Sequence, residues 1–536
     1  MSDIPEQIKL IDLNTNQMNG AESLVHTLIN CGVEVCFSNP GTSEMHFVAA
    51  LDKVAGMRCV LGLFEGVVTG AADGYFRMQD KPAATLLHLG PGLGNGLANL
   101  HNAGKAKSGI VNIIGDHASY HVKYDAPLTA DVEGIANPVS SWVRTSTCAT
   151  DVATDGAEAV AAANTYPGQV ASLILPANTA WEPSNGPAGK TEPPQTPKVP
   201  STRIEAIADI LKSGEPAAII ITGYALRDKP LQTASRIAEA TGVHLYGQTS
   251  NARLERGIGR VALKTIPYPV DAAVEVLRPY KHVISLSAKA PVAFFAYPDK
   301  PSGLYPADSS THVLAHEHED CVAALEELAE YLNANKAAPV LHKASPTPLP
   351  AAGSLNPKNI AAIIANLLPD NAIVVDESIT CAPPLFEQTQ ASAPHDWLQI
   401  CGGSIGAGFP LATGAAVACP DRKVVALQAD GSGMYTLQAL WTQSRENLDI
   451  TTILLSNSAY AILKHELKNV GAISGTQAGS VALDMMELNR PELDWVALAK
   501  GMGVEAGRAS DVTSLIKEIK RGLQSEGPYL IEAVFP

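Results

Sequence analysis

Short apolar runs alternate with amphipathic segments along most of the chain. Seven of these runs have the length and composition of buried parallel strands: Ala83–Leu89, Gly109–Ile114, Ala217–Thr222, His282–Leu286, Ala372–Val375, Val424–Gln428 and Ile450–Ser456. Alanine-rich helical patterns lie between them, for example at Ile204–Lys212 and Val322–Leu332. This alternation predicts an α/β protein with doubly wound parallel sheets, whose ligands bind beyond the carboxyl ends of the strands.

Two proline-rich segments, Glu182–Pro200 and Ala337–Gly353, interrupt the pattern. Such a composition is typical of extended linkers rather than of buried elements. They divide the 536 residues into three α/β segments, which agrees with the usual size of about 150 residues per domain. We therefore predict three domains, at residues 1–182, 201–336 and 355–536.

Composition and charge exclude several classes of protein. The chain is 46% hydrophobic and 17% charged, as expected for a globular protein with large cores. A formal net charge of -16, without a basic run, argues against a nucleic-acid partner. No signal-peptide core and no long apolar span are visible, so we expect no membrane association. The eight cysteines are scattered without a CxxC pair, which favours a reducing, cytoplasmic location.

Two polar residues follow neighbouring strands in the third segment. The run Val424–Gln428 leads into Ala429-Asp430-Gly431-Ser432-Gly433, and the next strand ends just before Asn457. One strand–helix–strand crossover separates them, so both side chains can face the same crevice. Carboxylate and amide oxygens suit Mg2+, and glycines before a helix suit a phosphate. Taken alone, the DGSG sequence is more typical of an ordinary strand-to-helix turn with a capping aspartate, and it is the second strand ending before Asn457 that favours the metal site.

An acidic residue, Glu65, follows the apolar stretch Leu61–Phe64 and precedes a helix predicted at Val67–Met78. Burying a carboxylate there is costly unless it has a function or reaches solvent. The alternative is a glutamate in the first helical turn, which the helix dipole favours.

The stretch from Asp430 to Asn457 resembles the metal and diphosphate signature of thiamine diphosphate (ThDP) enzymes. It is most similar to the branch of benzoylformate decarboxylase and acetolactate synthase. The resemblance implies that Asp430, Asn457 and the carbonyl of Ala459 bind Mg2+ and that Ser432 contacts the diphosphate. One departure is Ala429, where the family usually has glycine. The three domains would then be a pyrimidine-binding, a central and a diphosphate-binding domain.

The same resemblance assigns further cofactor contacts. Glu65, ahead of Ala71-Ala72-Asp73-Gly74-Tyr75, takes the position of the glutamate that binds the aminopyrimidine ring and activates the cofactor. Ile405 takes that of the bulky residue between the two cofactor rings. The full set of expected cofactor residues is Glu65, Ser378, Thr380, Ser404, Ile405, Asp430, Gly431, Ser432, Asn457, Ala459 and Tyr460. In the family, the glutamate and the metal motif come from different subunits, which implies a homodimer or homotetramer with active sites at the interface.

On the substrate side, Thr42 and His88 resemble an active-site serine and histidine of benzoylformate decarboxylase. Histidine can transfer protons near neutral pH, so His88 is our first candidate for acid–base work. Ala296 stands where that enzyme has a second histidine, which favours carboligation or another proton donor. Two polar groups would face either the substrate or solvent: Lys464, His465 and Glu466, and also His117, Tyr120, His121, Lys123 and Asp125.

The middle segment lacks a G-x-G-x-x-G motif, and a structural role is our default interpretation. The resemblance as a whole implies a non-oxidative 2-oxoacid decarboxylase or carboligase that uses ThDP and Mg2+ and acts on a small carbonyl substrate. The alternatives are an acetolactate synthase-type ligase, an enzyme that cleaves another donor such as a 2-hydroxyacyl-CoA, a flavin-dependent oxidase, and a catalytically idle relative.

Overall fold

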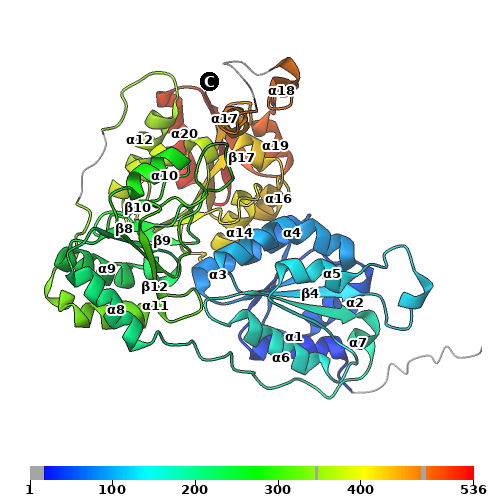
Figure 1. Ribbon diagram of the computed structural model, residues 1–536. Helices are drawn as coiled ribbons and strands as arrows, with labels where there is room; N and C mark the ends of the chain where they lie inside the picture. The colour runs from blue at the N-terminus through cyan, green and yellow to red at the C-terminus, as the bar shows by residue number, and fades with distance from the viewer. Residues whose placement is uncertain (1–16, 344–347, 473–478, 536) are drawn as a thin grey trace, which may run out of the picture.

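The structure is a computed structural model, and it describes residues 17–343, 348–472 and 479–535. The strands of these residues form three sheets, each with helices packed around it (Figure 1). Every neighbouring pair of strands is parallel except one, the pair of β9 and β14. The predicted α/β class with doubly wound parallel sheets is confirmed.

The first sheet has the strand order β2-β1-β3-β4-β6-β5. Its strands are β1 (Val35–Ser38), β2 (Arg58–Leu61), β3 (Ala83–His88), β4 (Ile110–Asp116), β5 (Trp142–Thr145) and β6 (Val170–Pro176). Its helices are α1 (Gly20–Asn30), α2 (Met45–Lys53), α3 (Glu65–Gln79), α4 (Leu89–Ala106), α5 (Val132–Ala136), α6 (Val152–Ala163) and α7 (Ala177–Trp181). The central strands β4 and β6 are almost entirely buried, as expected for strands covered on both faces.

The second sheet has the order β10-β8-β7-β11-β12. Its strands are β7 (Ala217–Ile221), β8 (His244–Gly247), β10 (Lys264–Thr265), β11 (His282–Leu286) and β12 (Ser310–Ala315). The helices of this part of the chain are α8 (Ser201–Lys212), α9 (Asp228–Thr241), α10 (Val270–Leu277) and α11 (Cys321–Tyr331). The segment 182–200 runs from the first sheet to α8 without helix or strand, apart from an isolated bridge between Asn19 and Pro183.

The third sheet has the order β17-β18-β16-β15-β13-β14-β9. Its strands are β13 (Ala372–Glu377), β14 (His395–Gln399), β15 (Val424–Ala429), β16 (Ile450–Ser456), β17 (Glu505–Ala509), β18 (Tyr529–Val534) and β9 (Leu254–Arg256). The helices are α12 (Pro357–Leu367), α13 (Ala382–Gln388), α14 (Gly408–Ala418), α15 (Asp430–Gly433), α16 (Ala439–Arg445), α17 (Ala461–Asn469), α18 (Ser480–Asp484), α19 (Trp495–Gly501) and α20 (Val512–Gln524). Because β9 comes from the middle segment, one strand of that segment is built into the third sheet.

Helices α3 and α14 pack backbone to backbone and join the first part of the chain to the last. A Cβ atom on Gly414 would lie 1.9 Å from the carbonyl oxygen of Ala71, and one on Gly74 would lie 2.2 Å from that of Leu411. Only glycine permits so close an approach. The contact fixes the start of α3, at Glu65, relative to the start of α14, at Gly408.

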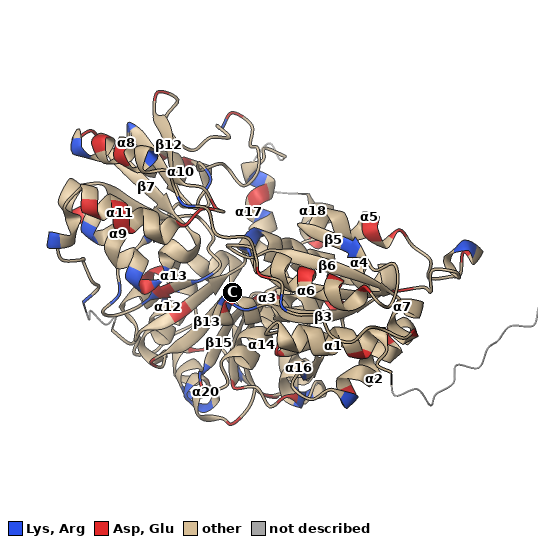
Figure 2. Cartoon of the chain, turned by 90° about the horizontal axis from the view of Figure 1, so that it is seen from below, with Lys and Arg blue, Asp and Glu red and all other residues tan. Residues whose placement is uncertain are grey.

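Charged residues are spread over the outer helices (Figure 2); α8 carries both signs, whereas α11 carries only acidic residues. Among the described residues, no helix is both long and apolar enough to cross a membrane.

Candidate active site

A narrow cleft lies at the carboxyl ends of β13, β15 and β16. Because β14 and β15 flank β13 on opposite sides, the strand order reverses beside it, which is where open α/β sheets bind ligands. Nine of the eleven expected cofactor residues line this cleft; Glu65 and Ser404 do not. The nine are Ser378, Thr380, Ile405, Asp430, Gly431, Ser432, Asn457, Ala459 and Tyr460.

Asp430 occupies the centre of the hydrogen-bond network at the end of β15. One carboxylate oxygen accepts the backbone N–H of Gly431 at 2.8 Å, and the other accepts those of Asn457 at 3.1 Å and Ser458 at 2.7 Å. The side-chain oxygen of Asn457 accepts the N–H of Ala459 at 3.1 Å. Asp430 therefore binds the loop after β16 directly, and the two predicted metal ligands are brought together.

The chemistry of these groups fits a cation bound to a diphosphate. Asp430 is 3% exposed, burial raises its pKa, and within the described residues no lysine or arginine forms an ion pair with it. A divalent cation would compensate this buried charge. A Cβ atom on Gly431 would lie 2.4 Å from the Tyr460 ring, so only glycine lets the ring approach the backbone this closely. No group of three or more His, Cys, Asp or Glu side chains suited to a metal occurs in the described ranges, but the expected ligands here include only one such side chain.

The hydroxyls beside the cleft are already oriented by the protein. Ser432 Oγ donates to the carbonyl of Ala429 at 3.1 Å and accepts from Gln428 Nε2 at 2.7 Å. Ser378 Oγ donates to Asp376 at 2.5 Å. Both hydroxyls are therefore held by hydrogen bonds within the protein.

The loop that carries Ile405 is held by hydrogen bonds on several sides. Glu377, at the end of β13, accepts three backbone N–H groups from residues 406–408. Asn102 of α4 binds the backbone of Ser404 through both its N–H and its carbonyl. Asn99 of α4 donates to the carbonyls of both Gly66 and Gly406. The sequence analysis did not assign Glu377, although an acidic residue at the end of a buried strand is the same signal that identified Glu65.

Glu65, Thr42 and His88 do not line this cleft. Glu65 is 7% exposed, begins α3 and accepts a hydrogen bond from Asn95 Nδ2 at 2.9 Å. His88 ends β3, and its Nδ1 lies 2.8 Å from Glu44. Thr42 is exposed at the start of the 3-10 turn Thr42–Glu44. Glu44, which sequence reasoning left without a role, thus joins the groups around His88.

The residues considered for the substrate pocket either have partners within the protein or are exposed to solvent. Glu466 accepts a hydrogen bond from the Tyr297 hydroxyl at 2.9 Å, and Lys464 pairs with Glu487 at 3.7 Å. Ala296 is exposed beside Phe294 and Phe295, whose rings are also half-exposed. Tyr120, His121, Lys123 and Asp125 are exposed on the loop after β4, and the His117 and His121 rings lie 5.5 Å apart.

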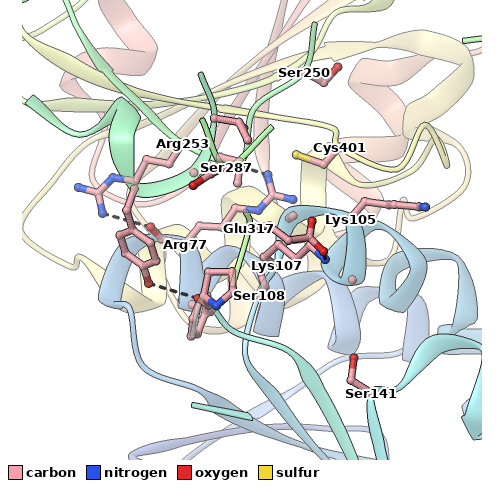
Figure 3. A pocket seen from close by; sticks show the side chains of 18 of the residues that line it. Arg77, Lys105, Lys107, Ser108, Ser141, Ser250, Arg253, Ser287, Glu317 and Cys401 are labelled. Atoms are coloured by element: carbon pink, nitrogen blue, oxygen red, sulfur yellow. Dashed lines mark hydrogen bonds and ion pairs between the residues drawn. The ribbon is translucent and has the colours of Figure 1, made fainter. Parts of the chain in front are cut away.

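A second, larger cavity of about 450 Å3 lies at the carboxyl ends of β7, β8 and β11, against α3 and α4 (Figure 3). Several basic side chains line it, and carboxylates neutralise most of them. Arg77 binds Asp73 at 2.6 Å, Arg253 binds Asp396 at 2.5 Å, and Lys107 binds Glu317 at 2.8 Å. None of the predicted site residues lines this cavity.

The Asp430 cleft lies at the switch point of a parallel sheet, a position where open α/β sheets bind ligands, phosphates among them. Comparisons with known proteins give the family. Residues 18–136 match the thiamine pyrophosphate enzyme N-terminal TPP-binding domain, and residues 379–533 match the C-terminal TPP-binding domain. The chain belongs to the family of thiamine pyrophosphate (ThDP) enzymes.

Similar proteins cover nearly the whole chain. A Mycobacterium tuberculosis protein with the provisional name acetolactate synthase large subunit IlvX is 48% identical over 97% of this chain and 99% of its own length. Benzoylformate decarboxylase of Pseudomonas aeruginosa is 28% identical over 94% of this chain and 96% of its own. The structure of a ThDP-dependent 4-hydroxybenzoylformate decarboxylase from Rhodococcus jostii has a TM-score of 0.83 at 23% identity, covering 97% of this chain and 99% of that one. This last likeness shows a shared fold.

Proposed function

We propose that this chain is a ThDP- and Mg2+-dependent enzyme that breaks the carbon–carbon bond beside the carbonyl of a small 2-oxoacid. The observation that carries the proposal is the cleft lined by nine predicted cofactor residues, Asp430 among them. Membership of the ThDP enzyme family supports the cofactor. Mg2+ is proposed from the donor set itself, one buried carboxylate with an amide oxygen and a carbonyl beside it.

Each group of residues would contact a different part of the cofactor. Asp430, Asn457 and the Ala459 carbonyl would bind the metal. Gly431 and Ser432 would contact the diphosphate, together with Ser378 and Thr380 across the cleft. Ser404, Ile405 and Tyr460 would contact the rest of the cofactor, with Ile405 between its two rings. When bound, ThDP supplies a nucleophilic carbon and accommodates the electron pair left when carbon dioxide departs.

Glu65 and His88 are the proposed proton-handling groups. Glu65 is buried, and among the described residues its only side-chain partner is the neutral amide of Asn95, so its second oxygen would be available to a ring nitrogen of the cofactor. His88 binds Glu44 through Nδ1, which leaves Nε2 to exchange a proton with the substrate. Thr42, exposed beside the Glu44 turn, would contact the substrate carboxylate.

We further propose that a second copy of the chain completes each site, as a homodimer or homotetramer. This is supported by the lining of the Asp430 cleft, which within one chain includes none of Glu65, Thr42 and His88. In this arrangement residues 1–182 act as the pyrimidine-binding domain, 201–336 as the central domain and 355–536 as the diphosphate-binding domain. A cytoplasmic location remains our proposal.

A carboligase of the acetolactate synthase type is the second candidate. It is favoured by the name of the 48% identical relative and by Ala296, which cannot donate a proton at the position where benzoylformate decarboxylase has a histidine. The two functions share every proposed cofactor contact and differ in whether the product is an aldehyde or a ligated acid.

The decisive experiment incubates the purified protein with ThDP, Mg2+ and 2-oxoacids from pyruvate to aryl and branched acids, with and without an acceptor aldehyde. Carbon dioxide and products are followed by mass spectrometry. We expect turnover that requires ThDP, and the product decides between decarboxylase and ligase. Tight ThDP binding without turnover of any acid would contradict the substrate class and favour another donor, such as a 2-hydroxyacyl-CoA. No ThDP binding at all would contradict the proposal.

A further inference from the structure

Glu377 is a buried carboxylate whose partners are neutral. It is 1% exposed at the end of β13. Its Oε1 accepts the N–H groups of Gly406 at 2.7 Å and Ala407 at 3.2 Å. Its Oε2 accepts the N–H of Gly408 at 2.7 Å and the side-chain amide of Gln428 at 2.9 Å. Burial raises the pKa of Glu377, and the hydrogen bonds from these four donors act in the opposite direction.

These bonds reach both walls of the proposed cofactor cleft. Residues 406–408 directly follow Ile405, which lines one wall. Gln428 Nε2 also donates to Ser432 Oγ at 2.7 Å, and Ser432 belongs to the opposite wall with Asp430. One carboxylate thus connects the loop that would bend the cofactor with the turn that would bind its diphosphate.

The backbone of the loop allows little freedom around this contact. Gly406 has a φ of 93°, a conformation that L-residues rarely adopt. A Cβ atom on Gly408 would lie 2.2 Å from Gln428 Oε1 and 2.9 Å from Glu377 Oε2. The Gly406 carbonyl is bound in turn by Thr436 at 2.9 Å and by Asn99 at 3.3 Å. Glu377 accepts the N–H groups of this loop, while Thr436 and Asn99 bind its Gly406 carbonyl.

We propose that Glu377 is the positioning residue of the cofactor site: its carboxylate fixes residues 406–408 and, through Gln428, the Ser432 turn, so that Ile405 faces the Asp430 wall in the protein before any cofactor binds. The inference rests on the proposed function, because a preformed loop favours binding only if the cleft takes up the cofactor. Preorganisation of this kind lowers the entropy that binding must otherwise remove.

The first test compares Glu377→Gln with Glu387→Gln, the same change at an exposed position of α13. A glutamine keeps one acceptor oxygen but turns an NH2 group toward the loop's N–H donors. We expect amide hydrogen exchange at 406–408 in the cofactor-free protein to rise about tenfold or more, and the dissociation constant for ThDP with Mg2+ to rise by a similar factor. Glu387→Gln should change neither quantity.

The exchange measurement needs no cofactor, so the inference and the proposed function fail separately. If the wild-type protein does not bind ThDP, the function is wrong, while exchange still reports whether Glu377 holds the loop. A folded Glu377→Gln protein with unchanged exchange and unchanged ThDP affinity would overturn the inference. If that variant does not fold, Gly408→Ala serves instead, because its methyl group would displace the Glu377 and Gln428 side chains while suiting the start of a helix. Unchanged exchange and affinity in Gly408→Ala would equally overturn it.

Discussion

The carboxylate of Glu44 lies 2.8 Å from Nδ1 of His88, although 44 positions separate the two residues in the sequence. The same oxygen accepts the N–H of Gly41 at 2.7 Å, so it acts as an acceptor and Nδ1 of His88 carries the proton. Glu44 is 2% exposed and its other oxygen accepts the Ser43 hydroxyl at 2.6 Å. This arrangement fixes the imidazole ring and leaves Nε2 as the atom that can take up or release a proton.

The first prediction concerns this pair. Glu44→Gln can keep the hydrogen bonds to Gly41 and His88 but removes the carboxylate charge beside the imidazole ring. We expect turnover at saturating ThDP to fall about 10- to 100-fold, because general acid–base catalysis contributes on that order. ThDP affinity, measured by titration, should stay within about twofold. Glu34→Gln, at an exposed site, is the control, and undiminished turnover in Glu44→Gln would show that its charge has no role.

The second prediction tests the role of Glu65 by a measurement that needs no substrate. Exchange of the thiazolium C2 proton of bound ThDP for deuterium can be followed by proton NMR after acid quenching. We expect Glu65→Gln to slow this exchange by about two orders of magnitude, since an amide cannot accept the proton of the cofactor's ring system as a carboxylate does. Glu192→Gln, in the exposed linker, should exchange at the wild-type rate. Equal rates in both variants would remove Glu65 from the mechanism.

Periodicity predicted the parallel α/β class and seven of its strands, and strand ends brought Asp430 and Asn457 together; the other cleft residues were assigned through the resemblance to ThDP enzymes. The runs at His282–Leu286 and Ile450–Ser456 are strands with those bounds, because buried parallel strands need continuous apolar residues. Asp430 and Asn457 were found because both follow strands on one edge of a sheet. β9 was missed, since a three-residue strand is too short to show a period.

The side-chain partnerships could not be predicted in the same way. Glu44 and Glu377 acquire their roles through contacts made only when distant segments meet, with His88 in one case and with residues 406–408 in the other. The sequence did not decide whether the charged residues of α17 face the substrate or solvent. In the structure Glu466 binds Tyr297 and Lys464 pairs with Glu487, and both partners lie outside α17. Such contacts depend on tertiary packing, which a local sequence pattern does not contain.

The third prediction tests whether two chains share each active site. Asp430→Asn should weaken Mg2+-dependent ThDP binding about 100-fold, because it removes the only carboxylate among the proposed metal ligands. Glu65→Gln should keep the cofactor but lack turnover. When the two inactive proteins are unfolded together and refolded, or co-expressed, hybrid dimers contain one site with both native residues. We expect activity to return in the mixture, and its absence in well-formed hybrids would place both residues of a site on the same chain.

The fourth prediction is a pH dependence of stability that arises from His395 on β14. Burial, together with the nearby positive charge of Arg256, lowers the pKa of His395 to about 3. The ring donates from Nδ1 to the carbonyl of Ala393 at 2.8 Å, and Nε2 is buried without a hydrogen-bond partner in the described structure. An unfolded histidine has a pKa of about 6.5. Between these two values the unfolded state therefore binds one more proton than the folded state.

The free energy of unfolding should consequently fall by about 1.4 kcal/mol for each pH unit as the pH decreases from about 6.5 toward 3, through this group alone. His395→Asn keeps a donor for the Ala393 carbonyl but cannot be protonated, so it should flatten the dependence by that amount. Urea unfolding of the wild type and the variant at pH 7, 6 and 5 measures the difference, with the exposed His318→Asn as the control. The destabilisation from His395 should be absent at pH 7 and should grow below about pH 6.5. If the free energies of unfolding of the wild type and of His395→Asn change in parallel between pH 7 and 5, His395 is already solvated in the folded protein.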